Sequence, residues 1–284
     1  MHENLKPYAG STASLLTQHG KEKVIAPILK KINDCHIKHV NHFDTDKLGT
    51  FTRETPRYGS QLDAARKKAR IGMELTGLSI GLANEGSFAN DPYTGLIPWN
   101  YEVVILIDDI RKIEITGYYG GESQSESIVV SCWKELEKSL PALQFPSHHL
   151  VLYPDNVNHP FFLKGISTVA GLKKAFNLTL EKSVNGLVFI ENDLRANTNP
   201  SRMRNISIAT DDLSRKMNSI CPDCNTPGYW IHQTKKGLPC SVCNRNTNLP
   251  IAKLWQCTKC NYGHEESIIQ DHLADPSKCN FCNP

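Results

Sequence analysis

Four pairs of cysteines, each with two residues between its members, constrain the end of this 284-residue chain more tightly than any other feature. Two cysteines at this spacing can face one metal ion from a single tight turn, and zinc takes four such ligands in a tetrahedron. The eight ligands therefore predict two closed structural zinc sites, with iron in rubredoxin-like sites as the alternative. The pairs are Cys221 and Cys224, Cys240 and Cys243, Cys257 and Cys260, and Cys279 and Cys282.

The spacing leaves open which cysteine pairs share a metal. Between Cys224 and Cys240 lie 15 residues, and between Cys260 and Cys279 lie 18. Both gaps fall in the range of a zinc ribbon built from neighbouring pairs, so the spacing favours sequential pairing. Interleaved pairing, in which the first pair joins the third and the second joins the fourth, is the alternative.

Ten cysteines would also suit disulfides in a small secreted chain. The opening residues lack the basic start and apolar core of a secretion signal, and the longest aliphatic run, 103–107, is far too short to cross a membrane. We therefore expect a soluble cytoplasmic protein with no membrane partner, in which eight of the cysteines bind metal.

The formal charge of +3 at first permits a nucleic-acid partner. Each zinc with four thiolates carries −2, so two loaded sites would bring the chain to about −1. The part from Cys221 onward has six Lys or Arg against five Asp or Glu, and it becomes acidic once the metals are bound. This negative charge makes nucleic-acid binding by residues 221–284 less favourable. It favours a structural module or a protein-docking surface.

The first 220 residues alternate short apolar runs typical of strands with amphipathic stretches typical of helices, which predicts an α/β fold with a mixed central sheet flanked by helices. A small zinc-ribbon domain should follow, and we place the boundary between residues 1–219 and 220–284. The predicted strands are 13–17, 78–83, 102–108, 112–118, 149–153 and 187–191. The predicted helices are 23–32, one that starts at the capping residue Ser60, 125–140, and 199–220 with Pro200 in its first turn.

Polar clusters follow several of these runs, where open α/β sheets collect their ligands. The β-to-helix loop near residue 20 suits phosphate oxygens, because backbone N–H groups and lysines converge there. Each cluster could instead be an ordinary surface turn or a solvated helix start. The candidate residues are Thr17, His19, Lys21 and Lys23 in this loop, Asp44, Asp46 and Glu54 after it, Glu85, and Arg195 and Arg202 near the last helix.

Glu85 stands out because it ends the apolar run IGLAN and precedes Gly86, as if a strand stopped there at a turn. A carboxylate in that place loses its hydration unless it meets a cation or a metal, and unpaired burial costs several kcal/mol. We therefore expect Glu85 to have a functional partner.

The segment 63–88 resembles the central motif of the inosine triphosphate pyrophosphatase-like proteins, which hydrolyse damaged nucleotides. The matching residues are Ala65, Lys68, Ala69, Thr76, Gly77, Glu85 and Gly86, and the family's first loop is similar to Thr17, Gln18, His19 and Lys21. The chain departs from the family at Asn84, where a second acid is usual. The whole chain also resembles a bacterial family known as a domain of unknown function, with CxxC knuckles near its C-terminus.

The resemblance implies a Mg-dependent hydrolase of a nucleotide or related phosphate compound, with residues 1–219 as the nucleotide-hydrolase-like domain. Glu85, with Glu54 or with Asp44 and Asp46, would hold Mg²⁺ or Mn²⁺. The phosphates would contact Thr17, His19, Lys21, Lys23, Lys68, Arg195 and Arg202. Two alternatives remain: a nucleotide-binding protein without turnover, which Asn84 would favour, and a zinc-ribbon adaptor that docks a protein or a nucleic acid.

Overall fold

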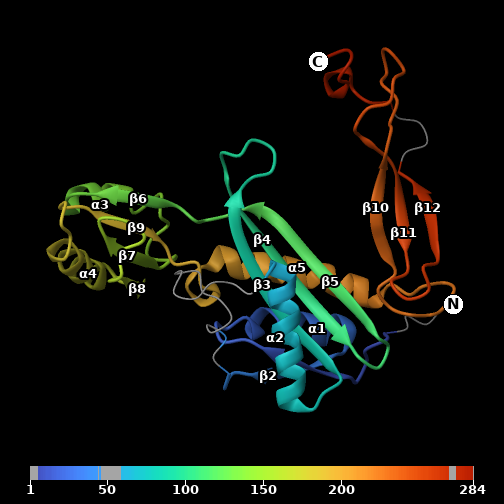
Figure 1. The fold of residues 1–284 in the computed structure, drawn as a ribbon, viewed down its shortest axis with the longest axis horizontal. Helices are drawn as coiled ribbons and strands as arrows, with labels where there is room; N and C mark the ends of the chain where they lie inside the picture. The colour runs from blue at the N-terminus through green and yellow to red at the C-terminus, as the bar shows by residue number, and fades with distance from the viewer. Residues whose placement is uncertain (1–5, 44, 46–58, 269–272, 284) are drawn as a thin grey trace.

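The computed structural model describes residues 6–43, 45, 59–268 and 273–283. Their strands form three separate sheets of five, four and three strands. In Figure 1 the five-stranded sheet lies in the centre, the four-stranded sheet lies to its left, and the three-stranded sheet projects at the right, beyond the far end of the long helix α5.

The five-stranded sheet has the strand order β2-β1-β3-β4-β5. Strand β1 pairs in parallel with β2 and β3, and β3, β4 and β5 form a long antiparallel meander. Its elements are β1 (Thr12–Leu16), α1 (Glu22–Asn33), β2 (His36–Val40), α2 (Gln61–Thr76), β3 (Ile80–Asn90), β4 (Pro98–Asp108), β5 (Ile113–Glu122) and α5 (Pro200–Asn218).

Helices cover both faces of this sheet, because alternate side chains of the strands are apolar on each side. Leu82, Val104 and Leu106 pack with α1 and α5 in one buried cluster. Ala83 and Ile105, their neighbours in sequence, pack with α2 in a second cluster on the opposite face. The result is a three-layer α/β/α arrangement.

The four-stranded sheet is formed entirely by the chain between β5 and α5. Its order is β6-β9-β7-β8, all antiparallel, and α3 and α4 bury their apolar sides against it in a third cluster. We call this part the inserted lobe. Its elements are β6 (Ser127–Val130), α3 (Trp133–Ser139), β7 (Leu150–Pro154), β8 (Leu163–Ile166), α4 (Val169–Glu181) and β9 (Val188–Asn192), followed by the short helix η2 (Ala196–Thr198).

The three-stranded sheet follows α5 and carries the cysteine pairs at its ends. It is an antiparallel meander with the order β10-β11-β12. Its elements are β10 (Trp230–Lys236), β11 (Pro250–Gln256), β12 (Gly263–Ser267) and the short helix η3 (Pro276–Lys278). We call residues 221–283 of this part the zinc arm.

The predicted fold class is confirmed: a mixed central sheet is flanked by helices and followed by a small cysteine-rich region. The starts of two helices are also as predicted, since Ser60 and Asp63 form a capping box on α2, and Asn199 caps α5 ahead of Pro200. The division after residue 219 remains a prediction.

Two predictions within the α/β part are wrong. The segment predicted as one helix at 125–140 contains strand β6 and then the shorter helix α3. Its first half contains the segment SIVV, whose three β-branched residues favour a strand once β9 is beside them. The strand predicted to stop at Glu85 continues to Asn90, paired throughout with β4.

None of the helices in the described residues has both the length and the apolar composition that crossing a membrane requires.

Helix α5 lies directly on the backbone of β5, and Gly117 makes this close approach possible. A Cβ atom at Gly117 would stand 2.2 Å from the Ala209 carbonyl oxygen and 2.4 Å from the Leu213 nitrogen. Both are backbone atoms that cannot move without shifting the helix. We therefore expect Gly117→Ala to lower the free energy of unfolding by about 2 kcal/mol or more, measured by urea denaturation.

Gly120→Ala, on the same strand, is the matched control. Its added Cβ would meet only aromatic side-chain atoms of Trp99 and Tyr101, at 3.3 Å. Equal losses of stability in the two variants would contradict direct packing of α5 on β5.

Candidate functional site

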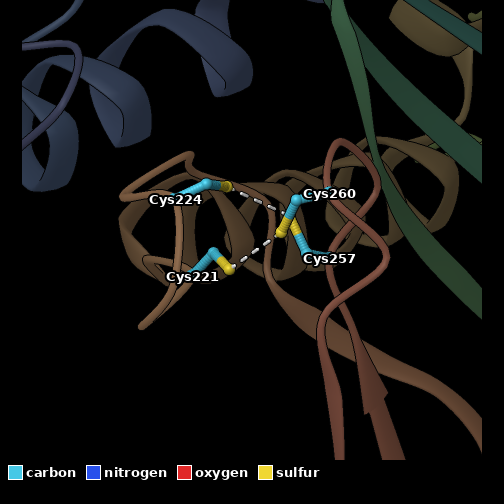
Figure 2. Close-up of side chains that lie close together, drawn as sticks. All are labelled: Cys221, Cys224, Cys257 and Cys260. Atoms are coloured by element: carbon cyan, nitrogen blue, oxygen red, sulfur yellow. Dashed lines mark hydrogen bonds between the residues drawn. The ribbon is translucent and has the colours of Figure 1, made fainter.

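The eight paired cysteines form two groups of four, and the pairing is interleaved. Within each group the sulfur atoms lie within 4.8 Å of one another. Figure 2 shows the first group, in which Cys221 and Cys224 face Cys257 and Cys260 with their sulfurs pointing inward. The second group joins Cys240 and Cys243 to Cys279 and Cys282. The sequential pairing that the spacing favoured is therefore wrong.

The geometry of both groups fits a tetrahedral metal ion. A tetrahedron with zinc–sulfur bonds of about 2.3 Å has edges of about 3.8 Å between sulfurs. The measured Sγ–Sγ distances are 3.7 Å for Cys221 and Cys260 and 3.6 Å for Cys224 and Cys257. In the second group they are 3.9 and 3.6 Å. Four thiolates at this separation could hold a zinc ion in a closed structural site, which would leave no position for a substrate.

The meander of the zinc arm explains the interleaving. Strand β10 carries the chain from the first cysteine pair to the second, so these two pairs lie at opposite ends of the sheet. Strand β11 runs antiparallel to β10 and returns the chain, which places the third pair beside the first. Strand β12 then carries the fourth pair to the second. Consecutive pairs separated by a full strand cannot share an ion.

The first cysteine group, near α5, is covered by aromatic rings. Tyr229 is buried against Cys221 and Cys257, and its ring lies 5.6 Å from that of Trp255. His264 stacks on Trp255 and contacts the Tyr229 hydroxyl through Nδ1, so this histidine packs beside the site while the cysteines supply its ligands. The Thr226 hydroxyl, 3.2 Å from the sulfur of Cys224, lowers the pKa of that thiol to about 6, which favours the metal-binding thiolate.

A second candidate site lies in the five-stranded sheet, where β1 ends beside β3. On the face covered by α2, Glu85 forms an ion pair with Lys68, and both side chains are buried. Burial alone would raise the pKa of the Glu85 carboxyl, but Lys68, Lys21 and Arg202 together hold it below its usual value. The partner of Glu85 in this structure is therefore a cation, the side chain of Lys68.

On the opposite face, covered by α5, Arg202 donates from Nε to Glu102 Oε1 at 2.8 Å. The side-chain amides of Asn84 and Asn100 donate to the same carboxylate at 3.0 and 3.2 Å. Arg202 also donates from Nη1 to the Leu194 carbonyl. These additional hydrogen bonds satisfy a buried ion pair that would otherwise be costly to desolvate.

The absence of a side chain at Gly86 leaves room for this ion pair, and Gly86 lies within strand β3 and not in a turn. A Cβ atom there would lie 2.5 Å from both Arg202 Nη2 and Glu102 Oε1. The glycine after Glu85 therefore makes room for the neighbouring charges on the α5 face. The interpretation of Glu85 and Gly86 as the end of a strand is corrected accordingly.

Lys21 lies between the two ion pairs. It is buried at the N-terminus of α1, and its Nζ donates to the Asn84 carbonyl at 3.2 Å, just beyond the point where β1 stops pairing with β3. Within the described residues no carboxylate oxygen lies within 4 Å of this ammonium. Burial first, and then the charge of Arg202, lowers the pKa of Lys21 from 10.5 to about 7.

The remaining predicted residues are placed as follows. Thr17 is buried and His19 half-buried in the loop from β1 to α1. Lys23 is exposed on α1, outside the buried charges. Arg195 forms an ion pair with Asp193 at 2.5 Å, whereas Glu85 and Glu102 pair with Lys68 and Arg202. Asp44, Asp46 and Glu54 lie outside the described residues.

Glu102 is the residue that the sequence analysis missed. It stands directly before the apolar run VVILI, as Glu85 stands directly after IGLAN. The argument applied to Glu85, that a carboxylate next to a buried run needs a cation, would have singled out Glu102 as well.

Together these residues form what we call the charge cluster: Lys21, Lys68 and Arg202 with Glu85 and Glu102. Three cations face two carboxylates, so the cluster is balanced only when Lys21 is neutral. The helix dipole of α1 adds partial positive charge at this end, and Glu22 in the first turn offsets part of it. Such a site attracts an anion, which would complete the charge balance of a protonated Lys21.

Double substitutions test the interleaved metal sites. Replacing Cys224 and Cys257 together by serine should leave one zinc per chain, because both belong to the first group. Replacing Cys224 and Cys243 should remove both ions, because each group loses one ligand. Zinc content by mass spectrometry of the purified protein measures this. The reverse result, none for the first variant and one for the second, would establish sequential pairing.

Comparison with known proteins places the chain in a family without assigning an activity. No curated protein matches it. A family model described as a domain of unknown function (DUF6671) matches residues 68–284, which include Lys68, Glu85, Glu102, Arg202 and all eight paired cysteines. Since the match covers most of the chain, this protein belongs to the DUF6671 family.

Proposed function

We propose that the charge cluster binds the phosphates of a nucleotide or a related phosphate compound, and that the protein hydrolyses this compound with the help of Mg²⁺. The observation that carries the proposal is Lys21, a buried lysine that lies near two ion pairs and whose partner among the described residues is the Asn84 carbonyl. Protonated lysine is a common phosphate ligand, and a phosphate oxygen would supply the anion that Lys21 lacks.

The arrangement of the neighbouring groups supports a phosphate rather than a free divalent cation as the primary ligand. Both carboxylates of the charge cluster already contact cations, Glu85 with Lys68 and Glu102 with Arg202. A cation arriving alone would have to displace a lysine or an arginine and would increase the positive charge. A phosphate group would decrease it.

Within this proposal Glu85 is the carboxylate of the charge cluster that Mg²⁺ would use, since Glu102 is held by Arg202 and two asparagines. Asp44, Asp46 and Glu54 are the further candidate ligands. Bound Mg²⁺ would neutralise charge on the phosphate chain and lower the pKa of a bound water. Lys68, released from Glu85 by the metal, would be free to contact a phosphate oxygen.

The resemblance to the inosine triphosphate pyrophosphatase-like proteins is compatible with this proposal and suggests nucleoside triphosphates as the first substrates to test. The matching residues Lys21, Lys68 and Glu85 all belong to the charge cluster. Asn84 occupies the place of the family's second acid, and its amide instead donates to Glu102 and to the Val103 carbonyl.

The direct test is release of phosphate or pyrophosphate from a panel of ordinary and damaged nucleoside triphosphates with Mg²⁺ or Mn²⁺. We expect turnover by the wild type and its loss, by at least a hundredfold, in Glu85→Gln, because the neutral amide cannot hold the metal. Glu137→Gln, on the exposed side of α3, is the control and should keep full activity.

No release by wild-type protein with its zinc content confirmed would exclude hydrolysis of these compounds. Calorimetric binding of a nucleotide would then identify a phosphate-binding protein without turnover.

Lys21→Met separates a functional lysine from a structural one. Methionine keeps an unbranched side chain but removes the amine whose burial is unfavourable, so the folded protein should be at least as stable as the wild type at pH 7. Since the pKa of Lys21 is lower in the folded than in the unfolded chain, protonation favours unfolding, and this penalty is largest below pH 7. Nucleotide affinity should fall at least tenfold in the same variant.

Thermal unfolding and calorimetry measure the two effects, with Lys31→Met, exposed on α1, as the control. A Lys21→Met protein that is less stable and still binds nucleotide would show that the lysine is structural.

A further inference from the structure

The far end of the zinc arm has features that neither its metal site nor the proposed hydrolase uses. We call residues 237–248 and 273–283 the distal tip. It contains the second cysteine group, and Figure 1 shows the C-terminal segment beyond the ends of β10, β11 and β12, away from α5. The distal tip therefore lies at a distance from the charge cluster.

Three apolar side chains are exposed on the distal tip. Val242 and Phe281, each inside a cysteine pair, are 73% and 59% exposed, and Leu273 is 54% exposed. At the other metal site no aromatic ring lies inside a cysteine pair, and the rings of Tyr229 and Trp255, outside the pairs, pack against the cysteines. Apolar side chains left in solvent next to a rigid metal site are typical of a contact surface.

An arginine stacks on the exposed ring. The guanidinium carbon of Arg245 lies 3.5 Å from the centre of the Phe281 ring. Within the described residues this guanidinium has no carboxylate within 4 Å, so its N–H donors and its outer face are available. Because the guanidinium is planar and charged, an aromatic base can stack on its outer face.

A hollow of about 300 Å³ lies beside this stack. Its other lining residues are the exposed Asn246, Asn248 and Asn280 and the buried Thr247 and Cys279. Each asparagine amide offers both donors and an acceptor, the combination that pairs with the edges of nucleobases.

The charge of the zinc arm is also unevenly distributed. Along the strands Lys235 pairs with Glu265, and Lys253 pairs with Glu266. Near the distal tip Lys236, Arg245 and Lys278 have no ion-pair partner within the described residues. Asp275 is the one acid of the distal tip, and a loaded second metal site would add −2, so together with these three cations the region is about neutral. The end of the arm is therefore less acidic than the arm as a whole.

We propose that the distal tip binds single-stranded nucleic acid, with one base stacked on the Arg245 and Phe281 pair and its edge in the asparagine-lined hollow. Stacking supplies the affinity, and the three cations contact the phosphates on either side. A double-stranded helix does not fit this scheme, because its bases are already stacked and their faces are covered. A protein partner matches this surface less well than a nucleic acid does, because it would need an acidic side chain at this position to balance the charge of the guanidinium.

Fluorescence anisotropy with labelled single-stranded RNA and DNA of about 12 nucleotides tests the proposal on the full zinc-loaded chain. Phe281→Leu keeps an apolar side chain but removes the aromatic ring, and Arg245→Lys keeps the charge but removes the planar guanidinium. We expect each substitution to weaken binding by about fivefold or more. Phe281→Tyr should bind like the wild type. Lys259→Ala, near the first metal site, should also leave binding unchanged.

Zinc content of two per chain verifies that each variant retains its fold. If Phe281→Leu loses the distal ion, Arg245→Lys still decides the question, because Arg245 is outside the cysteine pairs. Binding of RNA, of DNA or of both with this pattern supports the proposal. Absence of binding, equal binding by Arg245→Lys and wild type, or equal binding of a duplex would each overturn it, and the exposed surface would then belong to a protein contact.

Discussion

The buried ion pair between Glu102 and Arg202 fixes how the long β3–β4 hairpin meets helix α5. Breaking such a pair by removing one partner costs about 3–5 kcal/mol, because the other charge stays buried. Asn84 and Asn100 donate to the carboxylate, Gly86 leaves room for both side chains, and Asn199 caps the helix three residues before the arginine. The position of α5 at this end of the sheet follows from these contacts.

The ion pair also decides the character of the neighbouring site. Arg202 pairs with Glu102 and Lys68 pairs with Glu85, so within the described part of the chain the ammonium of Lys21 donates to the Asn84 carbonyl and has no carboxylate of its own. A fold selected only for stability would place an apolar side chain there. The unfavourable burial of Lys21 is explained if an anionic ligand is the missing partner, which is why we assign the site to a phosphate compound.

The sequence predicted the layers of the α/β part because its strands are apolar runs with helical stripes between them, as in 103–107 and in α5. It did not predict β2, α4 or β8. Helix α4 carries Leu172, Ala175 and Phe176 at helical spacing and could have been predicted, whereas β8 is only four residues long and becomes a strand by pairing with β7. The metal ligands were predicted from spacing alone, but their pairing was not, because it depends on the strands between the knuckles. The runs WIHQTKK and PIAKLWQ are long enough for strands, and recognising them would have given the interleaved order.

A crystal structure of the protein with a non-hydrolysable nucleoside triphosphate analogue and Mn²⁺ would test the central claim most directly. The account predicts a phosphate oxygen within hydrogen-bond distance of Lys21 Nζ, about 2.7–3.2 Å, and an anomalous signal for the metal next to Glu85. Density for the analogue only elsewhere on the chain, with Glu85 still paired to Lys68 and Lys21 still bound to the Asn84 carbonyl, would contradict it.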